Sequence, residues 1–351
     1  MKRVIIIFFL LTVFYVPVCA EEVGYLDDEA EYNALVADIV SGDLKLEPIT
    51  ILNKGISLIL GEVLNSKSLI VSIFVIAAAS GVLNVLETSF GNGESREIAF
   101  FACFTLIAIT VSRLLIEAVG YGIDVVERLS GFITKICPAL TILMVSSGAA
   151  VSAGSFSPVL SGTIYVISAI IEKVIVPLVY LSAVLGIVNN ITDKIQLKNL
   201  NNLIKSFSKW VLTAVLTVFT GINAIYGFSM PVLDTVSLKA VKFTVGSCVP
   251  VVGGLLADTV ETVLGGAKLM KNAVGTAGII TVAVICLLPA VKIAAIIVLL
   301  KIAAAVIEPV CDKRISAMVV DSAAPITIVF SMVLAAAMLF IVSISIIISA
   351  T

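Results

Sequence analysis

The sequence predicts an all-α polytopic membrane protein, and three observations support this fold class. Apolar residues make up 60% of the chain, and its mean hydropathy is +1.18. The charged residues gather into short clusters between long apolar runs, whereas a soluble helix needs only one apolar face. These runs lack the alternation of apolar and polar residues that is typical of barrel strands. We therefore predict helical spans, some of them broken or re-entrant, across residues 68–351.

The first twenty residues have the pattern of a signal peptide. A positively charged start precedes an apolar stretch over residues 4–16 and a small-residue cleavage site before Glu21. Two alternatives remain open: a lipid attached at Cys19, or a short span that is retained. Residues 21–67 are acidic at their start and are predicted to form an extracytoplasmic segment. Its later half has the spacing of an amphipathic helix, and a solvated leader is the alternative.

The apolar runs predict the first spans in chain order. Residues 69–86 form the first span, and a charged loop separates it from a second span over residues 98–119. A polar connector over residues 120–131 leads to a third span, residues 132–153. The third span ends in small residues, which let membrane helices approach closely.

Charge decides how residues 159–188 are interpreted. As one span the run is too long and carries Glu172-Lys173 in its middle. We therefore predict two short halves, residues 159–171 and 174–188, that turn back on each other. This pair puts residues 193–210, which are rich in lysine, on the cytoplasmic side. Apolar residues on one face of that segment predict an interfacial helix, and a solvated connector is the alternative.

The second half of the chain contains a region that is less lipid-like than its surroundings. After a span over residues 211–228, residues 231–272 hold several glycines, prolines and charges. Such residues predict helix breaks, which membranes tolerate only where protein or a watery cavity surrounds them. Three more spans, residues 273–291, 293–307 and 323–349, complete the chain.

Seven residues are candidates for lining a channel or contacting a partner. They combine helix-breaking residues with charges in or beside apolar runs: Gly246, Pro250, Gly253, Gly254, Asp258, Lys292 and Lys301. A charge at bilayer depth costs about 2.5–3.5 kcal/mol, so we predict that Lys301 lines a polar path or pairs with an acid such as Asp258. The alternatives are lysines that reach an interface and an ordinary solvated loop.

The composition argues against catalysis, metal binding and nucleic-acid binding. The chain has no histidine, which is the usual general base and the commonest metal ligand. Its six cysteines form no C-x-x-C pair, and no Gly-rich phosphate loop is present. The net charge of -2 offers no electrostatic footprint for nucleic acid. We therefore predict no enzyme activity, no cofactor and no metal site.

Several stretches resemble the stage III sporulation protein AE family of endospore-forming bacteria. They extend from about residue 69 to the C-terminus. The stretches are REIAF at 96–100, SSG at 146–148, SPV at 157–159, VKFTVG at 241–246, PVVG at 250–253, DT at 258–259, TV at 262–263, PAVK at 289–292, KIAAA at 301–305 and Pro309.

This resemblance implies a non-enzymatic subunit of the membrane complex that links mother cell and forespore after engulfment and supports late forespore gene expression. It implies a multi-pass protein in the mother-cell membrane around the forespore. The implied partners are the lipid bilayer, other stage III sporulation operon membrane proteins, a secretion-type ATPase and a forespore membrane partner. The residues themselves leave a second function open, a small-molecule or ion permease with a site built from broken helices and charges.

Overall fold

A computed structural model describes residues 75, 93–191, 197–248, 253–309 and 311–349, and every element in these residues is helical. The elements are α5 (Gly93–Ser146), α6 (Ala150–Ile170), the π-helix η1 (Ile171–Ile175), α7 (Val176–Asn189), α8 (Lys198–Cys248), α9 (Gly253–Ile307) and α10 (Lys313–Ser349). Five helical runs in the described residues are long and apolar enough to cross a membrane. The predicted all-α polytopic class is confirmed. The signal peptide and the span over residues 69–86 fall outside the description.

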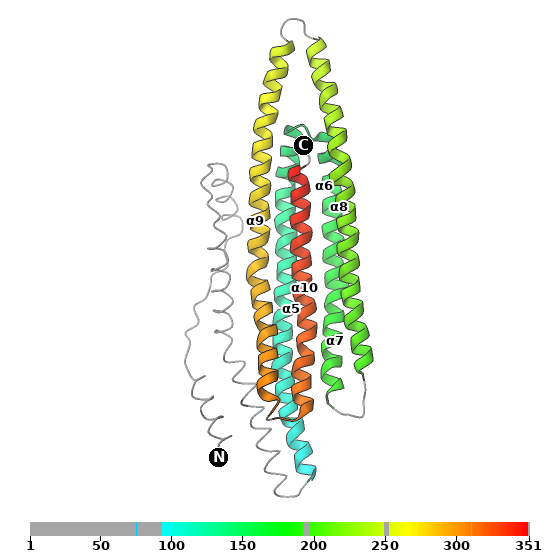
Figure 1. Cartoon of the computed structure of the whole chain (residues 1–351), viewed down its shortest axis with the longest axis vertical. Helices are drawn as coiled ribbons and strands as arrows, with labels where there is room; N and C mark the ends of the chain where they lie inside the picture. The colour runs from blue at the N-terminus through cyan, green and yellow to red at the C-terminus, as the bar shows by residue number, and fades with distance from the viewer. Residues whose placement is uncertain (1–74, 76–92, 192–196, 249–252, 310, 350–351) are drawn as a thin grey trace, which may run out of the picture.

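The five runs pack side by side into an elongated bundle (Figure 1). Consecutive runs point in opposite directions, with α6, η1 and α7 forming one of them. α10 packs against α5, α7, α8 and α9, and its buried residues recur at helical spacing along its whole length. Beyond the rest of the bundle, the end of α8 and the start of α9 continue together as an arm (Figure 1).

Small residues allow the helices to approach closely. Gly122 of α5 faces Met332 and Val329 of α10, and a Cβ at this glycine would lie 2.7 Å from both side chains. Gly275 of α9 meets Ile348 of α10 even more closely. Membrane helices associate through such packing because lipid tails are as apolar as the helices themselves.

The number of separate spans needs correction. α5 continues without a break through residues 120–131, so the predicted span over residues 98–119 and most of the one over residues 132–153 lie on one helix, and the rest of the latter crosses the turn into α6. Likewise α9 continues through Lys292, which joins the predicted spans 273–291 and 293–307. The charges in these segments did not interrupt the helices, because a charged side chain on a helix surface leaves the backbone hydrogen bonds intact.

The predicted re-entrant pair is also corrected. Residues Ala150–Asn189 form a single run, and the Glu172-Lys173 pair sits on a π-helical turn inside it. The interfacial helix predicted over residues 193–210 becomes, from Lys198 onward, the first part of α8. Both changes have one cause: the helices are longer than a bilayer is thick, so a charge in the middle of a run need not mark a turn.

Most of the helix breaks predicted for residues 231–272 are absent. Pro231 lies inside α8, and Gly265 and Gly266 lie inside α9. Only residues 249–252 separate these two helices. Membrane helices tolerate such residues when neighbouring groups satisfy the freed backbone atoms.

Candidate functional site

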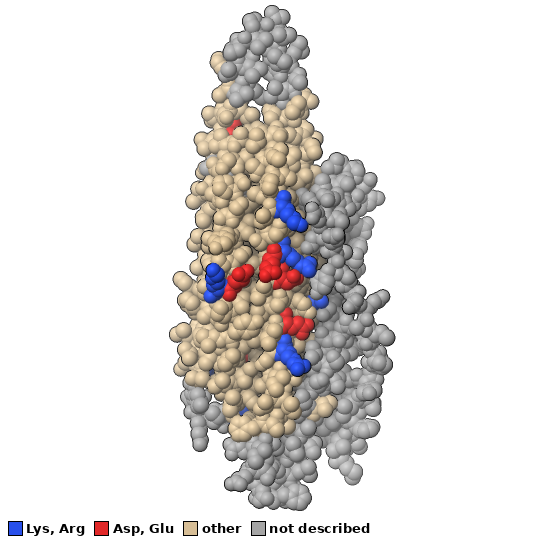
Figure 2. All heavy atoms as spheres, turned by 180° about the vertical axis from the view of Figure 1, so that it is seen from behind, with Lys and Arg blue, Asp and Glu red and all other residues tan. Residues whose placement is uncertain are grey.

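Charged side chains gather in a band across the middle of one face of the molecule (Figure 2). We call this band the charged belt. It comprises Glu117, Asp124, Glu127 and Arg128 of α5, Glu172 and Lys173 of η1, and Lys292 of α9. Four of these side chains, Glu117, Glu127, Glu172 and Lys173, are exposed. The surface above and below the belt carries few charges (Figure 2).

Local contacts hold the belt together. The Nε of Arg128 donates to Asp124 Oδ1 over 3.1 Å, one helical turn away. The Tyr121 hydroxyl donates to Glu117 Oε1 over 2.8 Å. The same tyrosine ring lies 5.1 Å below the Nζ of Lys292, a cation-π contact that joins α5 to α9. Exposed pairs of this kind contribute about 0.5–1 kcal/mol each, so the belt is a weakly stabilised polar surface.

Contacts between helices show that the belt crosses three helices at a common height, although it extends about 16 Å along α5 from Glu117 to Arg128. Cys137 Sγ of α5 lies 3.6 Å from Ser157 Oγ of α6. Counting sixteen residues down α5 from Cys137 leads to Tyr121. Counting sixteen residues along the antiparallel run from Ser157 leads to Lys173. Since Tyr121 also contacts Lys292, three separate helices carry charge at the same level.

Two further contacts extend this level to the remaining helices. Ser182 Oγ of α7 donates to Asn201 Oδ1 of α8 over 2.8 Å, and counting eleven residues along each antiparallel helix puts Leu212 near Ile171 and the belt. Gly278 of α9 faces Ile344 of α10. Counting fourteen residues from each along these antiparallel helices puts Phe330 of α10 at the height of Lys292.

Above the belt, each of the five helical runs has a stretch of membrane-spanning length. Charge-free stretches cover residues 150–171, 210–233, 272–291 and 330–349, and residues 129–146 of α5 carry only Lys135. The twenty-two residues from Ala150 to Ile171 make about 33 Å of helix, which matches a hydrocarbon core of about 30 Å. We infer that lipid tails surround this part of the bundle, which we call the upper half.

The part of the bundle below the belt, which we call the lower half, is less suited to contact with lipid tails than the upper half. Four of its five runs carry charge inside it: Arg113 of α5, Lys205 of α8, Lys301 of α9 and Asp321 of α10. Centring lipid tails here would cost about 2.5–3.5 kcal/mol for each such charge. We therefore infer that the charged belt lies at one surface of the bilayer.

A buried carboxylate lies at the other end of the upper half, beside the start of α6. Asp234 of α8 is 2% exposed and accepts hydrogen bonds from the backbone N–H groups of Val151 (2.9 Å) and Ser152 (3.2 Å) and from the Ser152 hydroxyl. No side chain in α6 itself caps this helix start. A carboxylate at a helix N-terminus satisfies otherwise unpaired amides and favours the helix dipole. Lys271 of α9, which is fully buried, lies within the electrostatic field of Asp234.

A second polar cluster lies near the other end of the bundle. Asn190 Nδ2 donates to Asp321 Oδ2 (3.1 Å) and to the carbonyl of Gly186 (2.8 Å). The Arg314 guanidinium lies 3.8 Å over the Phe100 ring and reaches the carbonyl of Ile191. These contacts tie the loop ends of α7 and α10 together. In the part of the chain that the structure describes, no group of three or more acidic or cysteine side chains is arranged to hold a metal ion.

Comparison of the chain with known proteins shows the family to which it belongs. The family model described as Stage III sporulation protein AE matches residues 30–351, which is nearly the whole chain. The chain belongs to the stage III sporulation protein AE family. The protein of that name from Bacillus subtilis (strain 168) is 27% identical over 329 residues, which cover 94% of this chain and 82% of the relative. No solved structure matches the chain. The predicted family is confirmed, and with it a role in sporulation.

The candidate residues of this AE-family chain lie in three places. Gly246 lies in the last turn of α8, Gly253 and Gly254 begin α9, and Asp258 follows in its second turn. Pro250 lies outside the described residues. Their role as channel-lining or contact residues stays a prediction.

The two candidate lysines are far from that region. Lys292 joins the charged belt, and Lys301 is exposed in the lower half. Forty-three residues of one continuous helix separate Lys301 from Asp258, about 65 Å, so the pair proposed from the sequence does not form.

Sequence reasoning overlooked Asp234 and Asp321, which bridge helices. The available signal was the same one that singled out the lysines: a single acid between two apolar runs, which needs a partner at membrane depth.

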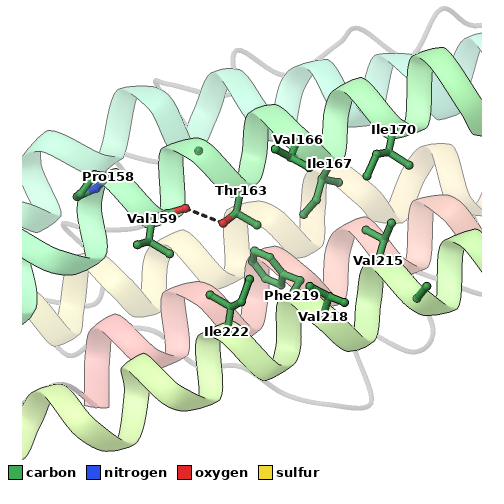
Figure 3. A pocket seen from close by; sticks show the side chains of 12 residues that line it. Pro158, Val159, Thr163, Val166, Ile167, Ile170, Val215, Val218, Phe219 and Ile222 are labelled. Atoms are coloured by element: carbon green, nitrogen blue, oxygen red, sulfur yellow. Dashed lines mark hydrogen bonds between the residues drawn. The ribbon is translucent and has the colours of Figure 1, made fainter.

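An apolar cavity of about 560 Å³ opens between α6 and α8 in the upper half (Figure 3). Its lining is Pro158, Val159, Gly162, Thr163, Val166, Ile167, Ile170, Ala214, Val215, Val218, Phe219 and Ile222. The Thr163 hydroxyl is already engaged, because it donates to the carbonyl of Val159 over 2.6 Å. The cavity thus offers no free polar group that would orient a charged or sugar-like substrate.

Proposed function

We propose that the protein is a membrane subunit of the channel or secretion complex that connects mother cell and forespore during sporulation. The observation that carries this proposal is the lower half of the bundle. It lies beyond the inferred bilayer surface and still exposes large apolar side chains, including Leu203 (64%) and Val184 (56%). Water-exposed apolar surface of this extent is typical of proteins that are covered by partners.

The charges inside the lower half support the same conclusion. If the bilayer were moved down to cover the lower half, the exposed Arg113 and Lys301 would lie at the depth of lipid tails and would themselves need protein or water around them. In the first placement apolar side chains of the lower half face water, and in the second placement charged side chains face lipid tails. A subunit of a larger assembly meets this requirement because its neighbours cover the remaining surface.

The proposed assembly follows the family. Its other members are other stage III sporulation operon membrane proteins, a secretion-type ATPase and a forespore membrane partner, and its place is the mother-cell membrane around the forespore. The chain contributes structure or a conducting path, and it performs no catalysis of its own. Any energy comes from the ATPase or from a gradient.

Purification from sporulating cells tests this proposal. The full-length protein carries an affinity tag at its C-terminus, and the membranes are solubilised in a mild detergent. We expect the operon membrane proteins and the ATPase to co-purify in fixed ratio, and the same tagged protein from vegetative cells serves as the control. Recovery of the tagged chain alone, in folded form, would contradict the proposal.

A small-molecule or ion permease is the second candidate function, and the buried charges Asp234 and Lys271 favour it. Against it, Asp234 already accepts hydrogen bonds from α6, and the cavity between α6 and α8 is apolar. Vesicles containing only the purified protein separate the two functions. Uptake of labelled metabolites or ions by these vesicles would favour the permease.

A further inference from the structure

We propose that the cavity between α6 and α8 holds one acyl chain of an anionic phospholipid from the surrounding bilayer. We call this cavity the α6–α8 groove. Its floor contains the buried side chains of Ile167 and Phe219, and its rims carry Val166 and Val218, which are 52% and 63% exposed. Figure 3 shows Ile167 of α6 pointing toward Phe219 of α8. The proposal depends on the bilayer placement inferred above and not on the proposed function.

The groove runs through the membrane leaflet next to the belt. On α6 it ends at Ile170, at the height of the belt, and begins at Pro158, about 18 Å higher. On α8 it starts two residues above Leu212 and reaches Ile222, about 15 Å above Leu212. One leaflet makes up half of a hydrocarbon core of about 30 Å. The groove therefore follows the direction of the lipid tails and is about as long as one tail.

The width of the groove fits one hydrocarbon chain. A volume of about 560 Å³ over a length of about 18 Å gives a mean cross-section of about 30 Å². A hydrocarbon chain is roughly 4–5 Å wide and occupies roughly 20 Å², because non-bonded carbon atoms approach to about 3.5–4.0 Å. An α-helix with its side chains is about 10–12 Å wide and needs roughly 80–110 Å². The groove therefore admits one acyl chain and is too narrow for a helix.

The lining also favours an acyl chain over a helix that lies across the rims. Transmembrane helices associate where small residues let their backbones approach. Val166 and Val218 project from the rims and would hold a helix away from the floor, leaving a void along which the lining loses van der Waals contacts. A flexible chain follows the groove and restores these contacts. The Thr163 hydroxyl already donates to the Val159 carbonyl, so a lipid tail leaves no polar group of the lining unpaired.

A basic side chain stands at the height of the lipid headgroup. Lys173 is exposed in η1, three residues beyond Ile170 and the end of the groove. It follows Gly162 by eleven residues, about three helical turns, so both residues lie on the same side of the run. Glu172 lies about a quarter-turn farther round and thus on another side. A lipid phosphate beside Lys173 places opposite charges together, which favours an anionic lipid.

Photolabelling of the purified full-length protein in liposomes tests the proposal. The probe is phosphatidylglycerol with a diazirine in the middle of one acyl chain, and mass spectrometry maps the labelled residues after irradiation. Leu287 of α9, which is 44% exposed, is the reference site, because it lies about 8 Å above Lys292 and so at the depth of Val166 and Val218. We expect at least fivefold more label on each valine than on Leu287 after correction for exposed fraction. Equal labelling would mean passing lipid only and would overturn the proposal.

A variant that fills the groove gives a second test. A Cβ at Gly162 would meet no atom within 4 Å, so the ring in Gly162→Phe can enter the groove without displacing protein. Gly154→Phe is the matched control, because Gly154 is equally open on the same helix but does not line the groove. Gly162→Phe should lower the groove label at least fivefold, whereas Gly154→Phe should keep it within twofold. Label on Leu287 should stay within twofold in both variants. Undiminished groove label in Gly162→Phe would contradict the proposal.

Two further probes identify the headgroup and the source of the chain. Phosphatidylcholine and a free fatty acid carry the same diazirine chain. At equal concentration, phosphatidylglycerol should label the groove at least threefold more than either, and Lys173→Gln should abolish its advantage over phosphatidylcholine while Lys173→Arg keeps it. Equal labelling by the two phospholipids would refute the anionic headgroup, and stronger labelling by the fatty acid would refute a phospholipid.

Crosslinking in sporulating cells tests the other possible occupants. p-Benzoylphenylalanine replaces Val218 in the full-length protein, and mass spectrometry identifies what it captures after irradiation. We expect a lipid adduct. Capture of a peptide from another protein, or from a second copy of this chain, would show that a protein covers the groove and would overturn the proposal.

Discussion

Replacing Asp234 should strongly destabilise the bundle, because this carboxylate joins α8 to the start of α6. In Asp234→Ala, the buried amides of Val151 and Ser152 lose their acceptor. A hydrogen bond to a charged group contributes about 1.5–3 kcal/mol, and the favourable interaction with the helix dipole adds up to about 2 kcal/mol in buried geometry. Because these contributions overlap, we expect a total loss of about 3–5 kcal/mol.

The measurement is the midpoint of thermal unfolding of the purified full-length protein in detergent. A loss of this size should lower the midpoint by on the order of 10 °C, since about 1 kcal/mol shifts the Tm of a large domain by about 2–4 °C. Asp234→Asn keeps one acceptor oxygen and should fall between wild type and Asp234→Ala. Thr235→Ala is the matched control, because its hydroxyl is exposed and bonds only within its own helix.

A second readout locates the damage. Loss of the carboxylate should expose the turn at residues 147–149 to proteases, while the turn between α9 and α10 stays as resistant as in wild type. A midpoint for Asp234→Ala within about 2 °C of wild type would refute the reasoning, because it would mean that the buried amides find another acceptor at no cost.

Four further predictions follow from individual residues. Gly148→Ala should cost about 1–3 kcal/mol in unfolding free energy, because Gly148 has φ of 93° and a Cβ there would lie 2.7 Å from Leu238 Cδ1, whereas Gly154→Ala, in open space on α6, should be neutral or stabilising. Burial raises the pKa of the Cys311 thiol from 9.0 to about 11, so at pH 8 its thiolate fraction and alkylation rate should be roughly one hundredfold below those of an ordinary thiol, and rapid labelling would contradict this. Lys301→Met should leave the unfolding midpoint within about 2 °C of wild type, since the side chain is exposed; a larger loss would indicate an unseen partner. Asn199→Cys in a cysteine-free background should resist a membrane-impermeant thiol reagent in intact cells and react after permeabilisation, because the lysine excess of residues 193–210 favours the cytoplasmic side, and ready labelling of intact cells would contradict this.

The sequence predicted the class of the fold and its family, but misjudged where helices end. Composition and apolar runs identify a helical membrane protein because backbone groups at bilayer depth must be satisfied internally. The same reasoning read Glu172-Lys173 and Lys292 as turns or boundaries. It assumed that each apolar run matches one bilayer crossing, whereas α5 has 54 residues and α9 has 55. Helix length depends on packing against neighbours, which hydropathy along one chain does not reveal.

The candidate site was predictable only in part. The sequence singled out Lys292 as a charge between apolar runs, and the structure places it over the Tyr121 ring in the belt, while its role stays a prediction. Its neighbours in the belt lie on helices far away in the sequence, and their common height follows from contacts such as Cys137 with Ser157. The role of Asp234 was equally hidden in the sequence, because the amide groups that it accepts hydrogen bonds from lie at the start of α6, more than eighty residues earlier. Such relations require the packed structure.

Depth measurements along α8 test the central claim, that lipid surrounds the upper half and leaves the lower half outside. Single spin labels replace Leu203, Val218, Ile225 and Val236, all at least 63% exposed, in purified full-length protein reconstituted into liposomes. Oxygen, which concentrates in lipid tails, and a water-soluble nickel chelate compete to relax each label. The account predicts the highest oxygen accessibility at Val218 and Ile225 and high nickel accessibility at Leu203. An oxygen maximum at Leu203, with nickel reaching Val218, would place the bilayer around the lower half and contradict the account.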